Sequence, residues 1–160
     1  LIAHREITML IYLVRHGVAV DKAESDAARE LTREGVLQTR SMVEKWKPYS
    51  PTIDKALMSP YQRARQTATA FRMLFPAMPI AVDKQLEPGG DPYGVLDYIE
   101  ACEAHQILLI SHNPLLSNLL SVMVDGTMES NRHVGNSHLI CVAMDIIAPG
   151  CGEIQYTLEP

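Results

Sequence analysis

Short aliphatic runs alternate with longer segments of helical periodicity, and this alternation restricts the fold more than any other feature of the chain. The clearest run, Gln106 to Ile110, holds four consecutive aliphatic residues, which is too short for a helix but typical of a strand covered on both faces. Further strands are predicted at residues 10–14, 55–58, 80–82, 139–147 and 154–158. Strands that alternate with helices predict an α/β domain with a mainly parallel central sheet flanked by helices.

Helix signals fill the segments between these strands. Thr32 is a predicted N-cap, and Pro48 limits the helix that follows it. Apolar residues recur at roughly helical spacing in that segment, at Val36, Leu37, Val43 and Trp46. A second helix is predicted after Ser59-Pro60, with one apolar face formed by Ala64, Ala68, Phe71 and Leu74. Two further helices are expected, one through Leu96 and Ile99 and one over residues 115–124.

Length and composition agree with a single domain. Of the 160 residues, 47% are hydrophobic and 21% are charged, which supplies enough apolar material for one core and excludes a mainly disordered protein. We therefore expect one domain over residues 9–160. Residues 1–8, which precede Met9, are predicted to be an N-terminal extension without a function of its own.

Charge and cysteine content exclude several classes of protein. The formal net charge of -5 is opposite in sign to the basic surface of nucleic-acid binders, so no nucleic-acid partner is expected. Three cysteines without a CxxC pair suit neither a disulfide framework nor a structural zinc site, and they favour a cytoplasmic location. The apolar runs fall far short of the about 20 residues that cross a bilayer, so no membrane association is expected.

Residues suited to phosphate chemistry follow three of the predicted strands. Arg15 and His16 come directly after the first strand. Arg63 lies in the first helical turn after the second strand, and His112 follows the strand at residues 106–110. Ligands of open α/β sheets bind beyond the carboxyl ends of the strands, so these four side chains are predicted to converge at one edge.

Two arginines and two histidines at one edge have a specific chemical meaning. Guanidinium groups match the geometry of phosphate oxygens and stay charged at any relevant pH. A neutral imidazole can attack phosphorus and hold the phosphoryl group covalently, while a second, protonated imidazole stabilises the charge on the phosphoryl oxygens. The residues alone leave open which histidine is the nucleophile.

Other hydrolase and phosphatase motifs are missing from the sequence. No cysteine is followed six positions later by arginine, and there is no Asp-x-Asp motif. The GxxxxGK[ST], HExxH and GxSxG patterns are also missing. No metal site and no cofactor are expected.

Four short motifs, in order along the chain, resemble those of the histidine phosphatase superfamily, and the compact length resembles its SixA-type phosphohistidine phosphatases. The motifs are Leu13-Val14-Arg15-His16-Gly17, Leu31-Thr32-x-x-Gly35-x-x-Gln38, Ser59-Pro60-x-x-Arg63-Ala64-x-Gln66-Thr67 and Ser111-His112-Asn113-Pro114. The resemblance implies a three-layer, phosphoglycerate-mutase-like α/β fold.

The same resemblance implies roles for individual residues. His16 is the expected phosphorylated nucleophile, and Arg15, Arg63 and His112 complete the expected phosphate pocket. Many members of the superfamily also use an acidic proton donor from the region after the third strand. Glu87 and Asp91 occupy that region here, with Glu87 as the candidate donor and Asp91 as the alternative.

The expected function is a metal-independent phosphatase that acts on phosphohistidine of a signalling protein, for example a histidine phosphotransfer domain. Cleavage of a P–N bond expels imidazole, a better leaving group than an alkoxide, so a weak proton donor suffices. The chain also has no long insertion that would fold over the pocket as a lid. The alternatives are a broad phosphomonoesterase for small molecules and a module that binds a phosphorylated ligand without turnover.

Overall fold

Strands and helices alternate through the part of the chain that the computed structural model describes, residues 8–160. The strands are β1 (Met9–Arg15), β2 (Lys55–Met58), β3 (Ile80–Val82), β4 (Gln106–Ser111), β5 (Leu139–Met144) and β6 (Gly152–Leu158). The α-helices are α1 (Arg33–Trp46), α2 (Gln62–Leu74), α3 (Pro92–Ala101) and α4 (Leu115–Asp125). Short 3-10 helices are η1 (Asp26–Ala28), η2 (Lys47–Tyr49), η3 (Lys84–Leu86) and η4 (Met128–Ser130). Of the extension predicted at residues 1–8, all but Thr8 lies outside the described residues.

The strands form one six-stranded sheet in the order β3-β2-β4-β1-β5-β6. Strands β1 to β4 run parallel to one another, whereas β5 and β6 are antiparallel to their neighbours. The prediction of a mainly parallel sheet is therefore confirmed. Because β1 and β2 both flank β4, the carboxyl ends of these three strands lie next to each other.

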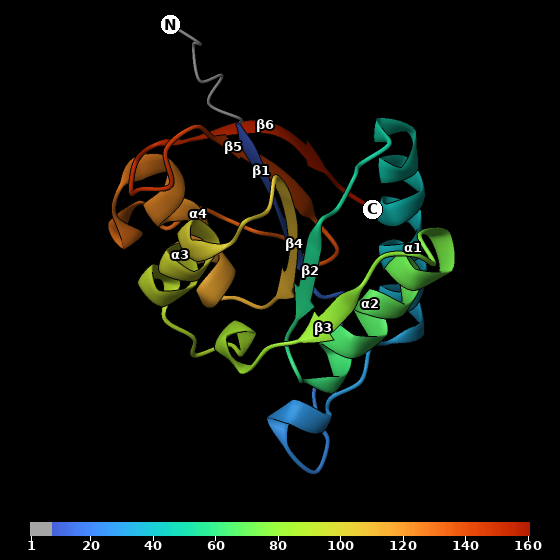
Figure 1. Ribbon diagram of the computed structural model, residues 1–160. Coiled ribbons are helices and arrows are strands. Elements are labelled where there is room, and N and C mark those ends of the chain that lie inside the picture. Colours follow the sequence, from blue (N-terminus) through green and yellow to red (C-terminus); the bar gives the residue numbers. More distant parts are fainter. Residues whose placement is uncertain (1–7) are drawn as a thin grey trace, which may run out of the picture.

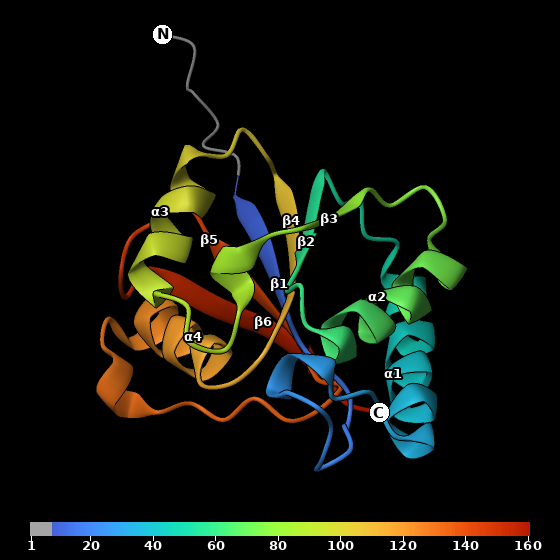
Figure 2. The ribbon, with the colours of Figure 1, turned by 90° about the horizontal axis from the view of Figure 1, so that it is seen from below.

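Helices cover both faces of this sheet, so the domain has three layers (Figure 1). Alternate residues of β1 point to opposite faces. Ile11 and Leu13 join the core under α3 and α4, while Tyr12 and Val14 join the core under α1 and α2. The segment with η1 lies beside the beginning of α2, at the carboxyl edge of the parallel strands (Figure 2).

The predicted helix after Thr32 is confirmed, but its predicted inner face is partly wrong. The Thr32 hydroxyl accepts a hydrogen bond of 3.0 Å from the Gly35 amide and caps the helix. Val36 and Leu37 face outward, with 48% and 58% of their surface exposed. The sheet-facing residues of α1 are instead Gly35, Thr39, Met42, Val43 and Trp46.

The predicted strand at residues 139–147 ends earlier, at Met144. Met144 pairs with Gly152 at the beginning of β6, so the connection between the two strands has to begin at Asp145. Within residues 8–160, the helices are all too short or too polar to cross a membrane.

Candidate active site

The carboxyl edge of the sheet brings the four predicted site residues together. Arg15 ends β1, His16 follows it, and His112 follows β4. The His16 amide donates a hydrogen bond of 3.1 Å to the Ser111 carbonyl, which joins the two strand ends. The rings of His16 and His112 lie with their centroids 4.9 Å apart, and Arg63 reaches His16 from the first turn of α2. The predicted convergence is therefore observed.

Two hydrogen bonds determine the protonation state of His16. A carbonyl oxygen can only accept, so the contact of 2.7 Å between His16 Nδ1 and the Gly17 carbonyl requires a proton on Nδ1. Nε2 accepts a hydrogen bond of 3.2 Å from Arg63 Nε and must carry a lone pair. Burial lowers the pKa of His16 to about 4; the Gly17 hydrogen bond opposes this shift and Arg63 adds to it. His16 is thus a neutral imidazole with its Nε2 lone pair toward Arg63.

The backbone after His16 fits closely against the first turns of α1, and two glycines permit this approach. A Cβ atom on Gly17 would lie 2.7 Å from both the Gly35 carbonyl oxygen and the Thr39 hydroxyl. A Cβ atom on Gly35 would overlap the backbone of Val18. The Gly17 amide also donates to the Thr67 hydroxyl at 3.2 Å, which links this backbone to α2. The glycines of two sequence motifs therefore hold the His16 loop against both helices.

Arg63 is buried, with 4% of its surface exposed, and an acidic residue from η1 holds its outer end. Nη1 donates to the Asp26 carbonyl at 2.6 Å, and Nη2 donates to the Asp26 carboxylate at 3.1 Å. Arg29 donates to the same carboxylate at 2.9 Å. The hydrogen bond from Arg29, followed by that from Arg63, lowers the pKa of Asp26. Asp26 is therefore ionised and fixes the plane of the Arg63 guanidinium.

Arg15 and the end of β1 are held by the loop before β5. Arg15 Nη1 donates to the Val134 carbonyl at 3.0 Å, and the Asn136 side chain donates to the His16 carbonyl at 3.0 Å. Ser137 has a φ of 55°, in the left-handed region of the backbone. In this conformation its amide donates to the Arg15 carbonyl at 3.1 Å. Burial and the neighbouring Arg63 lower the pKa of Arg15.

His112 is positioned by Ser59, which follows β2. The contact between His112 Nε2 and the Ser59 hydroxyl is 2.7 Å long. Burial, followed by the charges of His16 and Arg63, lowers the pKa of His112 to about 2. The lowered pKa of His112 disfavours the protonated form that was expected, because burial and the neighbouring cations outweigh the opposing charge of Asp26. A neutral His112 can still donate from Nδ1 if the Ser59 hydroxyl donates to Nε2.

Unpartnered buried polar atoms gather at this edge. Within residues 8–160, the buried side-chain nitrogen and oxygen atoms without a hydrogen-bond partner are Arg15 Nε, His112 Nδ1 and Asn113 Oδ1. Buried polar atoms are normally paired, and each unpaired one costs about 1–3 kcal/mol. Arg15 Nε and His112 Nδ1 come from the ends of neighbouring strands and, together with the Arg63 guanidinium, define a site for an anion with several oxygen atoms.

The two acidic candidates differ in their surroundings. Glu87 follows η3 and is half-buried, and its side chain makes no hydrogen bond or ion pair with any described residue. The preceding Leu86 carbonyl accepts a hydrogen bond of 2.6 Å from Ser111, so Glu87 lies near the end of β4. Asp91 is exposed and caps α3 by accepting from the Tyr93 amide. Its carboxylate already has a structural role, which leaves Glu87 as the acidic candidate at this edge.

Sequence reasoning missed two parts of this site. Asp26 lies in a charged segment without periodicity, 37 residues from Arg63. The loop from Val134 to Ser137 carries only a turn signal, Gly135-Asn136, which predicts a tight backbone but not its contacts. Within residues 8–160, no group of three His, Cys, Asp or Glu side chains is arranged to hold a metal ion.

The fold and the site together define a phosphoryl-binding α/β protein, and the comparisons with known proteins agree. The family model described as "Histidine phosphatase superfamily (branch 1)" matches residues 11–87. Two curated relatives are the phosphohistidine phosphatase SixA of Escherichia coli and its homolog from Haemophilus influenzae. The first is 30% identical over 95% of this chain and 94% of its own length, and the second is 31% identical over 71% and 76%. The chain belongs to the histidine phosphatase superfamily.

Within the superfamily, the predicted resemblance to SixA-type proteins is confirmed. A solved structure of the protein histidine phosphatase SixA with tungstate superimposes with a TM-score of 0.82, 28% identity and coverage of 95% of this chain and 97% of that chain. A structure described as a phosphohistidine phosphatase SixA from Agrobacterium tumefaciens has the same TM-score at 22% identity and supports the fold alone.

Proposed function

We propose that this chain is a phosphohistidine phosphatase that works through a phosphohistidine of its own, at His16. The observation that carries this proposal is the state of His16: its Nδ1 proton is fixed by the Gly17 carbonyl, and its Nε2 lone pair lies toward Arg63. A neutral, oriented imidazole among cationic groups suits attack on phosphorus. A module that only binds phosphate has no need of such a nucleophile. Residues 9–160 act as the single domain of this enzyme.

In the first step, the lone pair of His16 Nε2 attacks phosphorus. The substrate ring reacts in the form that already carries a proton on its other nitrogen. When its P–N bond breaks, the ring takes the bonding electron pair and leaves as neutral imidazole. Arg63 Nε, which donates to Nε2 in the free site, donates to a phosphoryl oxygen instead. Arg15 Nε and His112 Nδ1 then gain the partners that they lack in the free site.

In the second step, water attacks the phosphoryl group on His16. The P–Nε2 bond breaks, inorganic phosphate leaves, and the imidazole regains its lone pair. The same donors stabilise the phosphoryl oxygens in both steps, because the group stays at one place while its bond partner changes. Since the charge stabilisation comes from Arg15, Arg63 and His112, turnover does not depend on a divalent metal.

The proposed substrate is phosphohistidine of a signalling protein such as a histidine phosphotransfer domain. Two curated relatives carry the name phosphohistidine phosphatase SixA, one of them as a homolog. Because imidazole leaves more readily than an alkoxide, this reaction needs little help from a proton donor such as Glu87. The three cysteines Cys102, Cys141 and Cys151 are all free thiols, which supports action in the cytoplasm.

Hydrolysis assays test this proposal. A phosphorylated histidine phosphotransfer domain should be hydrolysed with a kcat/KM well above that of every member of a panel of small phosphomonoesters. Exhaustive chelation should leave that rate unchanged. Faster turnover of a phosphomonoester would favour the broad phosphomonoesterase, and binding of the phosphoprotein without release of phosphate would favour the binding module. Loss of activity on chelation, with recovery on adding a metal, would contradict the metal-independent mechanism.

A further inference from the structure

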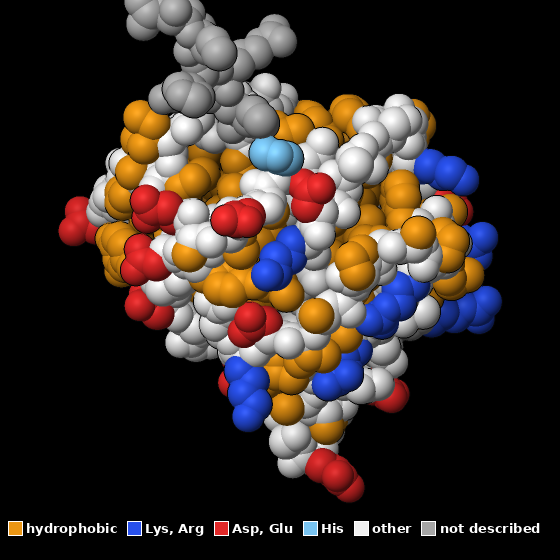
Figure 3. Space-filling model, in the orientation of Figure 1, with side chains coloured by type: hydrophobic (Ala, Val, Ile, Leu, Met, Phe, Trp, Pro, Cys, Tyr) orange, Lys and Arg blue, Asp and Glu red, His pale blue; other side chains and the backbone are white. Residues whose placement is uncertain are grey.

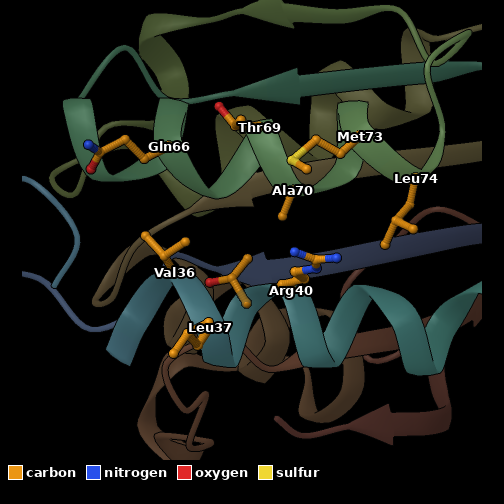
Figure 4. A pocket seen from close by; sticks show the side chains of 9 residues that line it. Val36, Leu37, Arg40, Gln66, Thr69, Ala70, Met73 and Leu74 are labelled. Carbon is orange, nitrogen blue, oxygen red and sulfur yellow. The ribbon is translucent and has the colours of Figure 1, made fainter. Parts of the chain in front are cut away.

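A solvent-facing groove of about 340 Å³ runs between α1 and α2, separate from the phosphate site (Figure 4). From α1, the groove is lined by Val36, Leu37, Thr39 and Arg40, and from α2 by Gln66, Thr69, Ala70, Met73 and Leu74. Figure 4 shows Val36, Leu37 and Arg40 along one side and the residues of α2 along the other. The groove is mainly apolar, and no described residue outside the two helices lines it.

The groove gathers large apolar side chains that face solvent. Val36 is 48% exposed, Leu37 is 58% exposed and Met73 is 65% exposed. Single exposed apolar residues are ordinary, but neighbouring ones on a concave surface are typical of a protein interaction site. An unbranched methionine adapts to different partner surfaces. The groove therefore has the side chains of a docking surface.

The groove begins beside the phosphate site. Gln66 lines the groove one helical turn after Arg63, and its side chain accepts a hydrogen bond of 2.6 Å from the Leu31 amide. Thr39 lines the groove and bonds to Ser137, whose amide holds the end of β1. From there the groove continues along both helices toward Met73, away from the catalytic edge. A partner lying in it would extend directly from a group bound at His16.

Charge is divided unevenly between the layers of this acidic chain. Helices α1 and α2 together contain six Lys and Arg but only two Asp and Glu. Helices α3 and α4 together contain three Asp and Glu and no Lys or Arg. Figure 3 shows this division on one face, with Lys and Arg over α1 and α2 at the right and Asp and Glu toward α3 at the left. The layer that carries the groove thus attracts an acidic partner.

We propose that the α1/α2 groove docks an amphipathic, acidic helix of the phosphohistidine-bearing protein, and this inference rests on the proposed function. The lining residues of α2 recur at positions 66, 69, 70, 73 and 74, a single stripe of somewhat more than two turns. That length is about 12 Å and fits two to three turns of a partner helix. A helix with an apolar ridge fills such a groove, while an acidic residue beside the ridge competes with Glu44 for Arg40, the cation in the groove lining.

Two substrates that share the same P–N bond test this assignment. The double variant Leu37→Glu/Met73→Glu should lower kcat/KM for a phosphorylated histidine phosphotransfer domain by about tenfold or more, mainly through KM. Hydrolysis of free phosphohistidine, which is too small to reach the groove, should be unchanged. Ile146→Glu is the matched control, because Ile146 is 61% exposed in the connection between β5 and β6. It should leave both substrates unaffected.

Arg40→Gln provides a second, milder test that removes one cation from the groove. It should raise KM for the phosphoprotein and weaken the salt dependence of that reaction, with free phosphohistidine again unaffected. Unchanged kinetics of the phosphoprotein in both variants would overturn the inference, as would equal losses with both substrates. If the wild type dimerises and the double variant is a monomer with normal kinetics, the groove holds a second copy of the chain instead. If the wild type hydrolyses neither P–N substrate, the proposed function fails first.

Discussion

The end of β1 and the end of β4 each present a buried histidine to the same edge, yet the two rings have different hydrogen bonds. His16 has partners on both nitrogens, a carbonyl acceptor at Nδ1 and the Arg63 donor at Nε2. His112 has one partner, Ser59 at Nε2, and an unpartnered Nδ1. The two residues are of the same type, but their hydrogen bonds differ. These bonds suit the His16 ring to attack phosphorus and the His112 ring to donate to the phosphoryl oxygens.

The largest expected effect is that of His16→Ala. Removal of the nucleophile should lower kcat for the phosphoprotein by about four orders of magnitude or more, whereas His112→Ala should cost about a hundredfold to a thousandfold, as loss of a single donor does. Steady-state kinetics with both variants measure this ranking, with circular dichroism as the check on folding. A folded His112→Ala variant that is less active than His16→Ala would reverse the roles of the two strand ends.

Arg63 donates to His16 at the end of β1, and its loss should have the next largest effect. Arg63→Ala removes the donor at His16 Nε2 and a phosphate ligand, so kcat/KM should fall by about a hundredfold. Arg65→Ala is the matched control, because Arg65 is an exposed arginine two residues further along α2. Tungstate binding, measured by calorimetry, should weaken in the first variant and stay unchanged in the second. If the two substitutions lowered kcat/KM and tungstate affinity equally, Arg63 would have no specific role in phosphate binding.

The pH dependence of kcat/KM should show a moderate effect. Attack requires neutral His16, whose pKa is lowered to about 4, so the rate should be level between about pH 6 and 8 and should fall as the pH drops through 4. An ordinary histidine would produce this fall near pH 6.5. The rates have to be corrected for the uncatalysed hydrolysis of the acid-labile substrate. A midpoint near 6.5 would show that burial and Arg63 do not keep His16 neutral.

The smallest expected effect is that of Glu87→Gln. If imidazole leaves without assistance, this variant should change kcat for a phosphohistidine substrate by less than about threefold, since general acid catalysis otherwise contributes about a hundredfold or more. If the enzyme also hydrolyses a phosphomonoester slowly, Glu87→Gln should lower the rate of that reaction by a larger factor. Asp91→Asn serves as the control at the cap of α3. A large loss of phosphohistidine turnover in Glu87→Gln alone would make Glu87 the proton donor for both kinds of substrate.

The sequence predicted the carboxyl ends of the parallel strands well, because short aliphatic runs identify strands and parallel strands share one edge. These strand ends were enough to predict that Arg15, His16, Arg63 and His112 lie at one edge of the sheet. It did not predict the carboxylate that holds Arg63, because Asp26 reaches it through tertiary contacts from an aperiodic segment. Helical spacing also misassigned Val36 and Leu37, since apolar residues at an outer face follow the same period as those at an inner one.

The most direct test of covalent catalysis is a single-turnover reaction of the enzyme with a phosphoprotein that carries labelled phosphate. Because a P–N bond survives in base and breaks in acid, the reaction is quenched in base and the labelled peptide is identified. We predict that the label appears on His16, survives the alkaline quench and is lost on acidification. It should be missing from the His16→Ala variant under the same conditions. Label on Ser59, Ser111 or a cysteine, or release of phosphate with no trapped species at any time, would contradict nucleophilic attack by His16.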